Sequence, residues 1–131
     1  MLVVVMLPLF LSIIGLAIDG GVALSERRLL QNLADGAARA GAMQLDEGAY
    51  RQSSGTAVVL DTGAARAAAV EYLGSRATGL EATVVADPGR VMVRVSREVP
   101  LSFLRLVGIR TARIEATAPA EVRHGIETGT R

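Results

Sequence analysis

The chain opens with an unbroken apolar run, Met1 to Ile18, that ends at Asp19. The run contains no charged side chain, and its only polar side chain is Ser12. A helix of about 18 to 20 residues is as long as the hydrocarbon core of a bilayer is thick. A backbone inside lipid must also satisfy its own hydrogen bonds, which a helix does. The run therefore predicts one membrane-spanning helix over residues 1–18.

Two other interpretations of this run fit less well. A signal peptide begins with a basic region and has an apolar stretch of roughly 7 to 15 residues, whereas this run is longer and begins without a basic side chain. The sequence Ala17-Ile18-Asp19 is also a poor cleavage site. A buried core helix would need a larger domain around it. Within the run, Pro8 marks the point where the helix would kink or loosen if it left the membrane.

The helical pattern continues beyond Asp19. Apolar side chains recur at steps of three and four residues: Leu30, Leu33, Ala34, Ala37, Gly41 and Leu45. Gly20 and Gly21 mark a candidate bend, since each glycine in a helix costs about 1 kcal/mol relative to alanine. The pattern nevertheless predicts that residues 19–45 continue the first helix.

Small residues repeat every four positions along this helix, a spacing that lets two backbones approach closely. One set lies near the membrane boundary: Ala17, Gly21 and Ser25. A second set lies further along: Ala34, Ala38 and Ala42, with Ala37 and Gly41 beside them. The first set has two interpretations: self-association with another copy of the helix, or close packing on the protein's own sheet. The second set is assigned mainly to packing within the chain.

Charged side chains on this helix supply two further candidates for helix packing and assembly, Asp19 and Asp35. Asp19 lies where the helix leaves the hydrocarbon, where ionisation is costly unless the group is paired. It is either a simple boundary residue or a contact to an arginine of a neighbouring copy, such as Arg27 or Arg28. Asp35 precedes Arg39 by four residues, an order that stabilises a helix by about 0.2–0.5 kcal/mol.

The rest of the chain alternates between helix and strand signals. Its expected elements are a loop over 46–63 with an extended piece at 57–60, a helix over 64–76 capped by Asp61 or Thr62, strands over 80–86, 90–99 and 110–122, a helical turn over 101–107, and a disordered tail over 124–131. The turn between the first two strands is Asp87-Pro88-Gly89. Arg97 breaks the alternation of valines and is expected to reach solvent.

These elements predict an α+β fold. A long N-terminal transmembrane helix continues into a small domain, over 46–123, with a second helix and a three-stranded antiparallel sheet. Helices would cover one face of the sheet.

Composition excludes several classes of function. The net charge is +1, and the chain has two Tyr, two Phe and no Trp, which argues against a nucleic-acid partner. It lacks Cys, and its single His, His124, lies in the expected tail. A membrane-associated hydrolase would need an oriented triad, and the one acidic pair, Asp46-Glu47, looks like a helix end. We expect no enzyme activity, no metal and no cofactor.

The sequence resembles TadE/TadG-like pilus assembly proteins. The resemblance rests on the apolar run LPLFLSIIGLAIDGG, with its boundary at Asp19-Gly20, and on the segment ERRLLQNLADGAARAGA after it. The motif residues in that segment are Leu30, Gln31, Asn32, Ala34, Asp35, Ala37 and Ala38. The later runs RVMVRVSREVPLSFLRLVGI and RIEATAPAEV are similar to the family as well.

The resemblance implies a minor pilin or pseudopilin-like component of the Flp (tight-adherence, type IV-like) pilus machinery. Such a protein is a single-pass cell-membrane protein whose C-terminal domain is extracytoplasmic. Its expected partners are other pilus subunits, the inner-membrane assembly platform, membrane lipid and copies of itself. The charge rule applied to Arg27 and Arg28 gives the opposite orientation, and we follow the family. The alternative function is a membrane-tethered extracytoplasmic binding module unrelated to pili.

Overall fold

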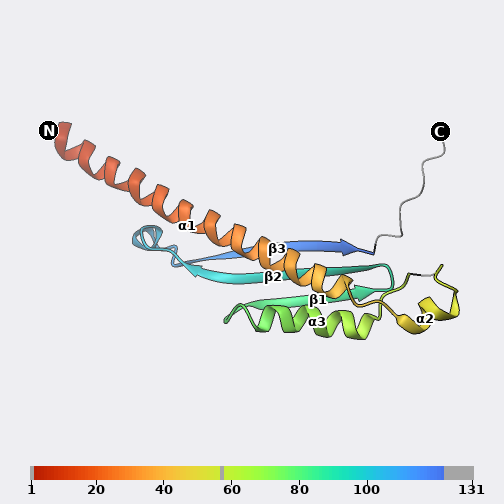
Figure 1. Cartoon of the computed structure of the whole chain (residues 1–131). Coiled ribbons are helices and arrows are strands. Elements are labelled where there is room, and N and C mark those ends of the chain that lie inside the picture. Colours follow the sequence, from red (N-terminus) through yellow and green to blue (C-terminus); the bar gives the residue numbers. More distant parts are fainter. Residues whose placement is uncertain (1, 57, 123–131) are drawn as a thin grey trace, which may run out of the picture.

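The computed structural model describes residues 2–56 and 58–122 as one long helix joined to a small two-layer domain (Figure 1). The expected tail, 124–131, lies outside the described residues. The elements are α1 (Leu2–Ala42), α2 (Glu47–Gln52), α3 (Thr62–Gly74), β1 (Glu81–Asp87), β2 (Arg90–Pro100), the 3₁₀ helix η1 (Leu104–Val107) and β3 (Thr111–Glu121). The predicted α+β class, with a further helix and a three-stranded antiparallel sheet, is confirmed.

Helix α1 is continuous over 41 residues. Neither Gly20 nor Gly21 interrupts it, so the candidate bend is not a break in the helix. Pro8 also lies inside the helix, and the Ser12 hydroxyl donates a hydrogen bond of 2.8 Å to the Pro8 carbonyl. In Figure 1 the N-terminal half of α1 projects beyond the domain, and its C-terminal half crosses the sheet.

The sheet is an antiparallel meander in the order β1-β2-β3. The turn at Pro88-Gly89 joins β1 to β2, as the sequence predicted, and the loop that carries η1 joins β2 to β3. The register places Val84 opposite Val93 and Val93 opposite Ala118. These residues share the inward face because side chains alternate between the faces of a strand.

The core lies between this face and the two long helices. The C-terminal half of α1 covers β2 and β3, and α3 lies beside it over β1 (Figure 1). The buried core residues are Leu30, Leu33, Ala34, Ala37, Ala38, Leu60, Ala65, Ala69, Leu73, Val84, Val91, Val93, Val95, Val99, Ile114, Ala116 and Ala118. Most of the helix residues in this set are alanines, so the helices can approach the valine-rich strands closely.

The outer face of the sheet is lined by charged side chains. Arg113 donates to the Glu81 carboxylate at 2.6 Å and to the Ser96 hydroxyl at 3.0 Å. Arg94 pairs with Glu115 at 3.0 Å. This face stays exposed, with Val85 among its exposed residues, and the sheet has one buried face.

Two local predictions were wrong. Helix α2 lies within the expected loop, and the Asp46 side chain begins it by accepting a hydrogen bond from the Ala49 amide at 2.9 Å. The pair Asp46-Glu47 is thus a helix start, not a helix end. Arg97 reaches solvent with 24% of its side chain exposed, and it also forms an ion pair with Glu26 of α1 and donates to the Thr78 carbonyl at 3.1 Å.

Gly41 offers a test of the close packing between α1 and the domain. A Cβ at this position would lie 2.9 Å from the Ala65 carbonyl oxygen and 3.2 Å from Val91. Since a backbone oxygen cannot move aside, we expect Gly41→Ala to lower the free energy of unfolding by roughly 1 kcal/mol net of its gain in helix propensity.

The matched control is Gly20→Ala on the same helix, where nothing lies within 4 Å of the added Cβ. This variant should be unchanged or more stable, by up to about 1 kcal/mol. Urea unfolding of the detergent-solubilised chain, followed by circular dichroism, compares the two. A Gly41→Ala variant as stable as Gly20→Ala would contradict the packing described for α1.

Candidate functional site

The N-terminal half of α1 has an apolar surface that the domain leaves largely uncovered. Its large side chains from Val3 to Ile18 are between 38% and 75% exposed. Among the described residues, α1 is the one helix long and apolar enough to cross a membrane. An uncovered apolar surface of this length needs a partner in place of water.

Asp19 joins this apolar half to the domain. Its carboxylate accepts hydrogen bonds from three consecutive backbone amides in the loop after β2: Ser102 at 3.0 Å, Phe103 at 2.8 Å and Leu104 at 2.8 Å. The side chain is consequently only 3% exposed, although it sits on a helix whose neighbouring residues face outward. We call this set of contacts the Asp19 clamp.

The hydrogen bonds of the clamp favour the ionised carboxylate. The Leu104 amide, followed by those of Ser102 and Phe103, lowers the pKa of Asp19 below its ordinary value of 3.8, and burial opposes this effect without reversing it. A lowered pKa in the folded state stabilises the fold above the unfolded-state pKa. That contribution is lost as the pH falls through the lowered value, so the clamp is fully formed at neutral pH.

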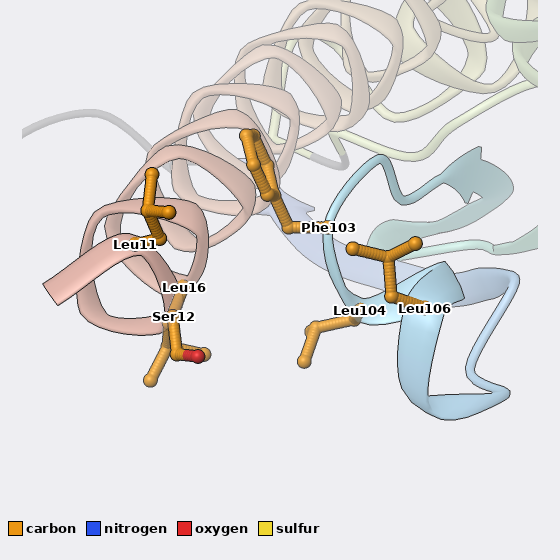
Figure 2. Close-up of a pocket in the computed structure, with 6 residues that line it drawn as sticks. All are labelled: Leu11, Ser12, Leu16, Phe103, Leu104 and Leu106. Atoms are coloured by element: carbon orange, nitrogen blue, oxygen red, sulfur yellow. The ribbon is translucent and has the colours of Figure 1, made fainter. Parts of the chain in front are cut away.

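One turn before Asp19, Gly15 completes the contact. Gly15 is buried, and a Cβ built on it would lie 2.5 Å from the Phe103 ring. Phe103, Leu104 and Leu106 of the loop and Leu11, Ser12 and Leu16 of α1 line the two sides of an apolar groove of about 330 Å³ (Figure 2). Sequence reasoning singled out Asp19 but missed Gly15 and Phe103, although the spacing of four between Gly15 and Asp19 places both on one helix face.

A second contact between α1 and the domain lies further along the helix. Glu26 pairs with Arg97 of β2, and both side chains are at least three-quarters buried. Since β2 is the central strand of the sheet, this pair ties α1 to that central strand. The clamp and the ion pair together hold the helix from Gly15 to Glu26 in one position.

The small residues of α1 divide between two environments. Ala17, Gly21 and Ser25 are exposed, whereas Ala34, Ala38 and Gly41 are buried. Two residues along a helix rotate by about 200°, so Ala17 and Gly21 lie on the side opposite Asp19. The exposed set faces away from the domain.

Asp19 and Asp35 both have hydrogen-bond partners within the chain. Asp19 takes backbone amides of its own chain as partners, and Arg27 and Arg28 are both exposed. Asp35 accepts a hydrogen bond of 3.2 Å from Gln31 in place of the expected pair with Arg39. Gln31 also donates to the Thr117 carbonyl at 3.3 Å, which ties α1 to β3.

The described part of the chain offers little for cofactor chemistry. In residues 2–56 and 58–122, no group of three or more His, Asp or Glu side chains is placed to hold a metal ion. The groove beside Gly15 is lined almost wholly by carbon, apart from the Ser12 hydroxyl, which is bonded to Pro8. The site is therefore suited to apolar contact.

Replacing Asp19 by Asn tests the clamp. An amide has one acceptor oxygen in place of two, so at least one loop amide loses its partner. We expect hydrogen exchange at the amides of Ser102, Phe103 and Leu104 to accelerate, while exchange in the centre of β2 stays slow. Asp35→Asn, at a half-buried position of the same helix, is the control and should leave these loop amides protected.

The same comparison has a defined pH dependence. The folded-state pKa of Asp19 lies below 3.8. The loop amides should therefore be better protected from exchange in the wild type than in Asp19→Asn by a constant amount from neutral pH to about pH 4, and this difference in protection should shrink below pH 4. Exchange rates measured across this pH range show whether the difference in protection shrinks as the pH falls. A difference that disappears well above pH 4 would mean that the ionised carboxylate does not hold the loop.

The comparisons with known proteins identify the α1 segment. Residues 1–44 match the family model described as "Putative Flp pilus-assembly TadE/G-like". No curated protein and no solved structure matches the chain. The matched segment coincides with α1, Leu2–Ala42, and includes both the apolar half and the clamp residues Gly15 and Asp19. The resemblance predicted from the sequence is thus confirmed over residues 1–44, where the chain is similar to the TadE/G-like family of Flp pilus-assembly proteins.

Proposed function

We propose that this protein is a structural component of Flp pilus assembly, held in the cell membrane as a single-pass protein by residues 1–18. The observation that carries the proposal is the coincidence of two findings on the same residues. The segment that matches the pilus-assembly family is also the helix that leaves an apolar surface uncovered by the domain. A lipid bilayer is the environment that such a surface requires.

The finer role that we propose is that of a minor pilin-like subunit. The Asp19 clamp and the Glu26–Arg97 pair make the domain a fixed extension of the helix, so a lateral contact made by α1 would also orient the domain. The exposed small residues Ala17, Gly21 and Ser25 offer a face on which a second helix could pack closely. Other pilus subunits, the assembly platform and further copies of this chain are the proposed partners.

The domain is proposed to lie on the extracytoplasmic side, with the protein in the membrane or in the pilus. This orientation follows the family and not the charge rule. Arg27 and Arg28 remain exposed just beyond the apolar half, so the proposal requires these two arginines to be translocated with the domain.

The alternative, a tethered binding module, places its ligand surface at the β1–β2 hairpin and at the turn after β2. Both segments are bonded to other parts of the chain. The Pro88 carbonyl accepts from the Leu60 amide at 2.9 Å, and the Gly89 carbonyl accepts from the Val122 amide at 3.0 Å. The turn after β2 is held by Asp19. This arrangement favours the structural role.

Leu9→Arg in the middle of the apolar half tests the anchor and the function together. An arginine at the centre of a membrane helix costs about 2.5–3.5 kcal/mol of insertion free energy. We expect the variant to leave the carbonate-resistant membrane fraction. We also expect it to fail to restore surface Flp pili in a strain from which the gene has been deleted, whereas the wild-type gene restores them.

Val70→Arg is the matched control, because Val70 is an exposed position of α3 away from the apolar half. This variant should remain in the membrane and restore pili. Normal pili in the deletion strain would refute the role in assembly. A Leu9→Arg variant that stays in the membrane would refute the anchor.

A further inference from the structure

The loop between β2 and β3 ends in an exposed apolar tip. Leu106 is 85% exposed, Ile109 is 51% exposed and Phe103 is 39% exposed. We call Phe103, Leu104, Leu106 and Ile109 the η1 tip. Apolar side chains gathered on a surface in this way are typical of a contact with a partner or with lipid.

The η1 tip lies beside the apolar half of α1 and extends past the boundary at Asp19. Phe103 packs on Gly15, and the groove continues to Leu11 (Figure 2). These positions are four and eight residues before Asp19, which is about 6 to 12 Å along a helix at 1.5 Å per residue. Elements that lie in the membrane interface reach depths of about 5–10 Å.

The backbone of this loop is bonded within the protein, as a segment that enters an apolar phase requires. The Asp19 carboxylate accepts from three of its amides. Further bonds run from the amides of Leu101, Leu106, Gly108 and Ile109 to the carbonyls of Arg110, Phe103, Arg105 and Leu104, respectively. The clamp thus removes three donors that would otherwise need water.

The charged side chains that the loop itself carries are both basic, while the Asp19 carboxylate of α1 is bonded to the loop amides. Residues 101–110 include two arginines, Arg105 and Arg110, and no acidic residue. Both arginines are exposed and lie together beside Thr111 near the base of the loop. An arginine beside an apolar element can place its guanidinium among lipid phosphates while its stem stays in apolar surroundings.

We propose that the η1 tip is a second membrane contact, inserted at the boundary of headgroups and acyl chains beside the transmembrane half of α1, with a lipid acyl chain in the groove. The proposal rests on the proposed anchoring of residues 1–18. The tip adjoins the apolar half of α1, which we assign to lipid, and lies at interfacial depth. Its backbone is hydrogen-bonded within the protein, and basic residues lie beside it. The domain would then meet the membrane at two points and could not swing freely about α1.

Site-directed fluorescence in lipid vesicles tests this inference. The chain contains no cysteine, so single cysteines can be placed at Leu106, at Leu9 and at Val70 and labelled with an environment-sensitive dye. All three positions are exposed, so the full-length chain should fold normally. It is reconstituted in phosphatidylcholine vesicles, with or without anionic phosphatidylglycerol, containing lipids brominated along the acyl chain.

We expect the label at Leu106 to shift to shorter wavelength and to be quenched by shallow bromines, with stronger quenching in anionic vesicles. The label at Leu9 should be quenched by deep bromines, and the label at Val70 should stay in water. Quenching at Leu9 with a water-exposed Leu106 would overturn the η1 contact and leave the anchor intact. A water-exposed Leu9 would overturn the anchor, and the η1 contact with it. Self-quenching at Leu106 that disappears on dilution with unlabelled chain would show that a second copy, and not lipid, covers the tip.

Discussion

The arrangement of this protein depends on one buried carboxylate. Asp19 sits where the apolar half of α1 ends, and there the residue is 3% exposed, so an unpaired ionised group would be unfavourable. Three backbone amides, from a loop more than eighty residues away in the sequence, donate hydrogen bonds to this carboxylate. Each partner would be costly to bury without a hydrogen bond. Their pairing fixes where the domain lies along α1.

The two halves of α1 differ in what covers them. Beyond Glu26 the helix supplies alanines to the valine-rich face of the sheet, which forms the core. Before Asp19 it supplies large apolar side chains that the domain leaves largely exposed. Because α1 is one continuous helix of 41 residues, it joins its uncovered apolar half rigidly to the half that packs on the domain. The match to the pilus-assembly family spans both halves, which fits a function in which anchor and domain act together.

The sequence predicted the elements whose signals are local. Alternating valines predicted β2, and the Pro88-Gly89 turn predicted the β1–β2 hairpin. The spacing of apolar residues at three and four positions predicted most of the buried face of α1. Contacts between distant segments left no such signal. Arg97 looked like a solvent-facing exception because Glu26 lies 71 residues earlier in the chain. Helix α2 was missed since it has no buried residue and therefore no apolar pattern. Asp19 was singled out by its position, but its partners are backbone amides, which carry no sequence signature.

Helix α1 and the domain form one rigid unit held at Asp19. Pulsed electron paramagnetic resonance between spin labels at Leu9→Cys and Val85→Cys in the membrane-reconstituted chain measures this directly. Val85 is exposed on the outer face of the sheet, so a label there should not disturb the core. We expect one narrow distance distribution, which broadens when Asp19 is changed to Asn. A broad distribution with Asp19 intact would contradict it.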